Sequence, residues 1–118
     1  DGSKDTTSTL TVGYIPDKYN ASMIWNPIIR SNYWVMGLSG LSFNGEAQNI
    51  SGYNGVILDS GTSLTVLTPA LYKKFIAKFP QDDLLDNSGF YMASCDSDKF
   101  SSYPNISITT ANGVFQIG

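Results

Sequence analysis

The chain has 118 residues, of which 42% are hydrophobic and only 14% charged, with a formal net charge of −3. This length allows one small domain with its own core, and the hydrophobic content excludes a disordered chain. The negative net charge argues against nucleic-acid binding. The sequence has no histidine, which excludes a serine-protease triad and a histidine-based zinc site. No apolar run reaches the length of a membrane span.

Apolar segments separated by turn residues predict a series of short strands in the first half of the chain. The expected strands are residues 10–14, 22–25, 33–38 and 40–43. Asn44-Gly45 is typical of a two-residue hairpin turn. The polar segment 1–8 is expected to be a loop or ragged start, the polar segment 46–54 is expected to be exposed, and residues 15–18 are expected to form a turn.

One helix is expected, after residue 67. Thr68 suits the N-cap, Pro69 suits the first helical position and Pro80 would end the helix. Its apolar face comprises Leu71, Phe75 and Phe79. Residues 81–88 are expected to form an acidic loop, and further strands are expected at 90–93, 106–109 and 114–117. The pattern predicts a mostly β chain.

The segment Asp59-Ser60-Gly61-Thr62-Ser63 is the most informative motif. The apolar run 56–58 precedes it and a second apolar run follows, so a carboxylate is expected at the end of a buried strand. Ser60, Thr62 and Ser63 can donate hydrogen bonds to it, and Gly61 lets backbone N–H groups approach. Asp-Ser-Gly is also an ordinary turn sequence, but the apolar flanks favour a site.

The run Val56-Ile57-Leu58-Asp59-Ser60-Gly61-Thr62-Ser63-Leu64 resembles the second active-site motif of pepsin-like aspartic proteases. Flanking segments in the same order extend the resemblance from about residue 10 onward. They are Ile24-Trp25-Asn26-Pro27-Ile28, Tyr33-Trp34-Val35-Met36, Leu41-Ser42-Phe43-Asn44-Gly45-Glu46, Thr68-Pro69, Cys95, Tyr103-Pro104-Asn105-Ile106-Ser107-Ile108 and Asn112-Gly113-Val114.

This resemblance implies half of a bilobal pepsin-like β-barrel fold, with one short helix after the catalytic turn. Residues 1–118 would be part of the C-terminal lobe, because the first Asp-Thr-Gly motif, the flap tyrosine and the later apolar-apolar-Gly segment are missing. The N-terminal lobe and the end of the C-terminal lobe would lie on other segments. The expected activity is endopeptidase cleavage at acidic pH.

The resemblance also implies residue roles. Asp59 would be one of two catalytic aspartates, with its carboxylate bonded by the Gly61 N–H and the Thr62 hydroxyl. Ser60 would reach across to the other lobe, and Ser63 would contact the substrate backbone, although turn capping is a live alternative for Ser63. Large aromatic side chains in strands usually pack in the core, so Trp25, Tyr33 and Trp34 are expected there.

The remaining implications concern maturation and partners. Cys95 is the only cysteine; it is either a buried free thiol or, by resemblance, half of a disulfide to a cysteine outside this chain. Asn-x-Ser sequons at Asn20, Asn49 and Asn105 favour a secreted or lysosomal/vacuolar glycoprotein, and the resemblance adds a zymogen. The expected partners are the remaining protease segments, peptide or protein substrates and statine-type inhibitors, with no metal or cofactor.

Other functional classes compete with this reading. A catalytically dead pepsin-like homologue could act as a binding protein. A retroviral-type homodimer would supply the second aspartate by symmetry, but it also needs an apolar-apolar-Gly segment downstream. A plain β-sandwich binding module is the remote alternative.

Overall fold

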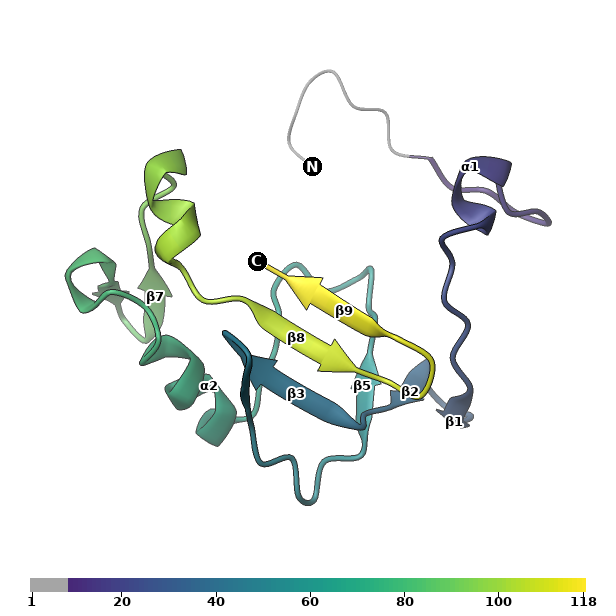
Figure 1. The fold of residues 1–118 in the computed structure, drawn as a ribbon, viewed down its shortest axis with the longest axis horizontal. Coiled ribbons are helices and arrows are strands. Elements are labelled where there is room, and N and C mark those ends of the chain that lie inside the picture. Colours follow the sequence, from purple (N-terminus) through teal and green to yellow (C-terminus); the bar gives the residue numbers. More distant parts are fainter. Residues whose placement is uncertain (1–8) are drawn as a thin grey trace.

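The computed structural model describes residues 9–118, so the expected loop 1–8 lies outside the described residues (Figure 1). Short strands dominate the described part, and they alternate with short helical turns. In chain order the elements are α1 (Asp17–Asn20), β1 (Ile28–Arg30), β2 (Val35–Gly37), β3 (Gly40–Phe43), β4 (Glu46–Ala47), β5 (Gly55–Ile57), α2 (Pro69–Ile76), η1 (Gln81–Asp83), β6 (Leu85–Asn87), β7 (Phe90–Met92), η2 (Ser97–Ser102), β8 (Ile106–Thr109) and β9 (Val114–Ile117).

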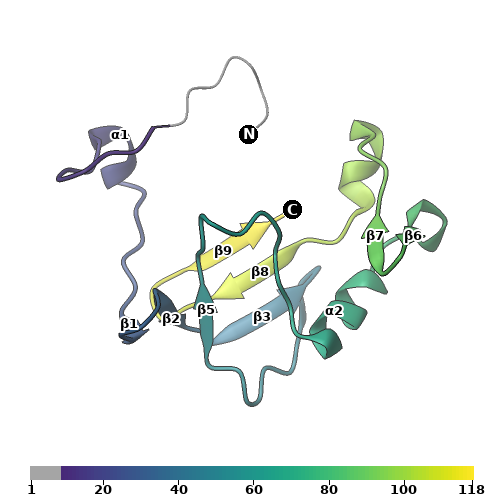
Figure 2. The same ribbon diagram turned by 180° about the vertical axis from the view of Figure 1, so that it is seen from behind.

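The strands form three antiparallel sheets. A three-stranded sheet has the order β1-β2-β5, a four-stranded sheet has the order β4-β3-β8-β9, and β6 pairs with β7 in a hairpin. In both views β5 crosses the four-stranded sheet (Figures 1 and 2). The result is an open, mostly β lobe in which the barrel does not close.

A small core joins the four-stranded sheet to α2. Leu41 and Phe43 alternate with less buried residues along β3, and they meet Leu71 of α2 and Ile106 of β8. Phe43 is completely buried, and its ring lies 5.1 Å from that of Phe75. Burying a phenylalanine is among the larger single contributions to a core.

Several predicted elements are confirmed. Strands β3, β8 and β9 have the expected bounds, and β2 and β7 lie within the expected ranges. Asn44 and Gly45 both have positive φ, 49° and 78°, which is the backbone that a two-residue hairpin of type I′ requires. Residues 46–54 are mostly exposed, as expected, and they begin with the short edge strand β4.

Two predicted strands are wrong. Residues 10–14 and 22–25 form no ladder, and the first strand is β1, further along the chain. Leu10 and Val12 are 89% and 83% exposed. Alternating hydrophobicity produces a strand only where a neighbouring backbone accepts its hydrogen bonds, and no strand of residues 9–118 pairs with either segment. The expected turn 15–18 runs into the single turn of α1.

The expectation that three aromatic side chains lie in the core is also wrong. Trp25, Tyr33 and Trp34 are 66%, 65% and 77% exposed. They flank the sheet of β1, β2 and β5, and no described element covers them there. Residue type alone therefore does not predict whether these side chains are buried.

The predicted helix is confirmed as α2, with differences at both ends. Thr68 occupies the N-cap, but its hydroxyl makes no capping bond and is buried without a partner. Pro69 begins the helix, which ends at Ile76 rather than at Pro80. The expected acidic loop 81–88 contains η1 and β6. The Gly89 N–H donates to the Asp86 carboxylate at 2.9 Å and closes the β6–β7 turn.

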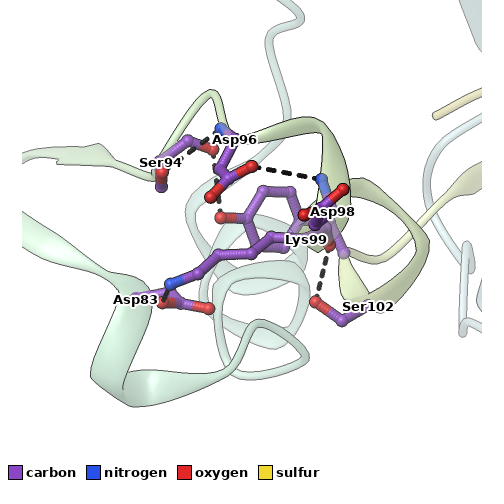
Figure 3. Close-up of polar contacts among 7 residues, drawn as sticks. Asp83, Ser94, Asp96, Asp98, Lys99 and Ser102 are labelled. Carbon is purple, nitrogen blue, oxygen red and sulfur yellow. Dashed lines mark hydrogen bonds and ion pairs between the residues drawn. The ribbon is translucent and has the colours of Figure 1, made fainter.

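Polar contacts fasten the segment after β7 to η1 (Figure 3). Lys99 of η2 pairs with Asp83 of η1, and the Asp83 carboxylate raises the pKa of Lys99 above its usual value. The Asp96 carboxylate caps η2 by accepting the Asp98 N–H at 3.2 Å. The Tyr103 hydroxyl donates to the Ser94 carbonyl at 3.0 Å. These contacts fix the short loop that carries Cys95.

Candidate active site

Strand β5 leads directly into the turn that contains Asp59. It pairs with β2 in the register Val35↔Ile57, Met36↔Val56 and Gly37↔Gly55. A Cβ at Gly55 would lie 2.5 Å from Cγ1 of Val35, so only glycine allows this close approach. The chain leaves the strand after Ile57, and Asp59 follows two residues later in a tight turn.

Two donors hold the two oxygens of the Asp59 carboxylate. The Gly61 N–H donates to Oδ1 at 2.9 Å, and the Thr62 hydroxyl donates to Oδ2 at 2.6 Å. The Thr62 N–H also donates to the Asp59 carbonyl at 3.3 Å. The two carboxylate hydrogen bonds that the resemblance implies are therefore present.

These bonds favour the ionised acid. The Thr62 hydroxyl first, and the Gly61 N–H second, lower the pKa of Asp59 below its ordinary value, because both donate to the charged form. A Cβ at Gly61 would lie only 3.2 Å from the Asp59 Oδ1 atom. Glycine thus keeps space for the carboxylate as well as supplying a donor.

The other two hydroxyls of the motif do not bond Asp59. Among the described hydrogen bonds, neither Ser60 nor Ser63 donates to its carboxylate, so the expectation of three hydroxyl donors is wrong for these two. Both are exposed, and Ser63 lines the groove beside the turn. Their side chains are free to meet groups from elsewhere.

The apolar flanks of the motif are exposed rather than buried. Ile57 and Leu58 are 48% and 62% exposed, and Leu64 and Val66 are 69% and 79% exposed. Strand β5 lies at the edge of its sheet, and no described element packs over the turn that follows it. The expectation of a buried strand before Asp59 is therefore wrong for residues 9–118.

An open groove of about 580 Å³ adjoins the turn. Asp59, Thr62 and Ser63 contribute to its polar lining, and apolar residues from both larger sheets, such as Val56 of β5 and Ile108 of β8, contribute to its apolar lining. Leu41, Leu71 and Ile106 of the core cluster also line it, so the groove opens onto the core of the lobe.

No other described carboxylate has such a setting. Asp86 and Asp96 each accept one backbone N–H through Oδ1, whereas Asp59 has a donor on each oxygen. Residues 9–118 contain no group of three side chains suited to a metal ion. Over the same residues, no helix is both long and apolar enough to cross a bilayer.

The cysteine and the three sequon asparagines differ in exposure. Cys95 is exposed and unpaired in the described part of the chain, so the buried free thiol is ruled out as its setting. Asn20 and Asn49 are exposed and Asn105 is half-buried.

The sequence profile of the eukaryotic aspartyl proteases matches residues 1–117. Similar curated proteins include an aspartic protease of Phaffia rhodozyma, 30% identical over 95% of this chain, and Pepsin F of Oryctolagus cuniculus, 33% identical over 86% of it. A probable aspartic-type endopeptidase CTSD of Arthroderma benhamiae is 32% identical over 76% of the chain. The chain spans 28%, 25% and 18% of these three relatives, in that order. No solved structure matches the chain significantly.

Proposed function

This chain belongs to the eukaryotic aspartyl protease family, and we propose that Asp59 is one of the two carboxylates with which the complete protein hydrolyses peptide bonds at acidic pH. The observation that carries this proposal is the pair of hydrogen bonds from Gly61 and Thr62 to opposite oxygens of Asp59. The motif adjoins an open groove.

In this proposal Asp59 acts on a water molecule. The ionised carboxylate takes a proton from water as the water oxygen bonds to the peptide carbonyl carbon; the C–N bond then breaks, and the nitrogen leaves as the amine with the proton that Asp59 took up. The two donors favour the ionised form of Asp59, because they lower its pKa. A second carboxylate, from a segment other than this turn, would polarise the carbonyl in its protonated form.

The proposal extends to the surrounding protein. The chain forms part of a C-terminal lobe, residues 1–118, and an N-terminal lobe provides the other catalytic aspartate. Ser60 contacts that lobe and Ser63 contacts the substrate backbone; both side chains are exposed, and Ser63 lines the groove. The complete protein is secreted or vacuolar, and Cys95 forms a disulfide with a cysteine outside the chain.

The test replaces Asp59 by asparagine in the complete protein. Asp59→Asn keeps the shape of the side chain and one acceptor oxygen, but it replaces the other oxygen by an NH2 group and removes the acid, so we expect acid proteolysis to fall about 100-fold or more. Asp82→Asn is the matched control, because it removes an exposed carboxylate outside the turn. Activity of Asp59→Asn within about threefold of the wild type would reject the proposal. A statine-type mimic should inhibit the wild type, because its hydroxyl meets both carboxylates.

A further inference from the structure

The loop between β4 and β5 presents the sequon Asn49-Ile50-Ser51 outward. Ile50 packs against the core cluster of Leu41, Phe43, Leu71 and Ile106. Asn49 and Ser51, on either side of it, are both exposed. The apolar middle residue therefore anchors the loop and directs its two polar neighbours to solvent.

The Asn49 side chain is ordered in a way that leaves its nitrogen free. Its Oδ1 atom accepts the Ser51 N–H at 2.9 Å, and within the described residues its Nδ2 makes no hydrogen bond. Attachment of a sugar replaces one hydrogen on Nδ2 and leaves Oδ1 unchanged, so this turn can persist in a glycosylated protein. The loop is also closed by the Tyr53 N–H, which donates to the Ile50 carbonyl at 2.8 Å.

The sequon at Asn105 has the opposite setting. The Asn105 N–H donates to the Asn44 Oδ1 atom at 2.9 Å, and its carbonyl accepts the Asn44 N–H at 3.1 Å. Ile106 is 4% exposed, and Ser107 pairs with Ser42 on one side and Gln116 on the other. A Cβ on Gly118 would lie 3.1 Å from the Asn105 Cβ atom. The base of this side chain is therefore enclosed, and the sequon hydroxyl lies in the middle of a sheet.

We propose that Asn49 is an N-glycan attachment site and that Asn105 is left unmodified. The inference rests on the secretory route in the proposed function. Asn49 precedes β5 and Asp59 follows it, and the two views place the loop and the catalytic turn at opposite ends of that strand (Figures 1 and 2). Asn49 does not line the groove. A glycan there can cover the loop without obstructing a substrate.

The test uses the complete protein secreted from a eukaryotic host, in an Asn20→Gln background that removes the third sequon. Peptide mass spectrometry after enzymatic deglycosylation in heavy-oxygen water measures occupancy at each asparagine. We expect heavy aspartate at position 49 and unmodified asparagine at 105. An unmodified Asn49, or equal occupancy at the two positions, would overturn the proposal.

Two substitutions at Ser51 separate the sugar from the turn. Ser51→Ala destroys the sequon but keeps the backbone N–H that Asn49 accepts, so it should remove the glycan without changing kcat/KM. Ser51→Thr keeps the sequon and should keep the glycan. A protein that is glycosylated at Asn49 but inactive at acidic pH would reject only the proposed enzyme activity, so the two failures are distinguishable.

Discussion

The close approach of β2 and β5 at Gly55 predicts how a single methyl group would disturb the site. In Gly55→Ala the new Cβ would lie 2.5 Å from Cγ1 of Val35. Carbon atoms pack without repulsion at about 3.5 Å or more, so the two atoms must separate by roughly 1 Å. Val35 is 6% exposed and β-branched, and its side chain has little freedom to turn away.

The expected cost follows from this overlap. Forcing an extra carbon into a packed position typically costs about 1–3 kcal/mol, so Gly55→Ala should lower the free energy of unfolding of the complete protein by that amount. Because β5 leads directly to Asp59, the displacement of the strand should also lower kcat/KM. Urea unfolding with a constant m-value, together with a peptide cleavage assay, measures both effects.

Gly37 supplies a matched control because it faces Gly55 in the ladder. A Cβ at Gly37 would lie 3.8 Å from Cγ2 of Ile29, an ordinary contact. Gly37→Ala should therefore be near neutral, and the double variant Val35→Ala/Gly55→Ala should be less destabilised than the two single variants predict together. If Gly55→Ala and Gly37→Ala are equally stable, the packing argument is wrong.

Three further predictions concern the turn, the cysteine and the chain by itself. Thr62→Val should reduce activity more than stability and move the acid limb of the pH profile to higher pH, because the lost hydroxyl is the main cause of the lowered pKa of Asp59. Thr62→Ser keeps a hydroxyl and should retain the wild-type profile. An unchanged profile in Thr62→Val would contradict the proposed role of this hydroxyl. Cys95 should resist thiol labelling in denatured, unreduced native protein, whereas full labelling would show a free thiol. The purified 118-residue chain should lack acid proteolysis as a monomer, and activity in a dimer would instead favour the retroviral-type arrangement.

Thr62 also predicts a pH dependence of stability. The folded-state pKa of Asp59 is lowered, so its contribution to stability is present above the unfolded-state pKa and is lost as the pH falls through the folded-state value. Thr62→Val should therefore lose most stability relative to the wild type near neutral pH and converge with it at strongly acidic pH. Unfolding midpoints measured across that range test the sign.

Features set by neighbouring residues could be predicted from the sequence. The Asn44-Gly45 turn needs two positive φ angles, which these residue types allow. The start of α2 is marked by Pro69. The two hydrogen bonds to the Asp59 carboxylate come from residues two and three positions further along the chain. Short-range geometry and the resemblance therefore both predict these bonds.

Features that depend on distant partners could not be predicted in this way. Alternation at residues 10–14 indicates a strand, but the ladder requires another backbone. Trp34 and Leu58 are apolar, yet their burial depends on what covers each face. The same limitation applies to Ser60 and Ser63, because side chains in a turn can serve the carboxylate or a neighbouring segment equally well.

The hydrogen bonds to Asp59 favour one of the two protonation states that the proposed function requires. Its donors stabilise the charged carboxylate and lower its pKa. Two carboxylates that share a proton also need influences that raise a pKa, namely desolvation and a nearby like charge. The exposed apolar residues Leu58 and Leu64 lie where a covering segment would exclude water. Under the proposed function, the turn would favour the ionised form of Asp59, and the proton on the second carboxylate would depend on groups outside this turn.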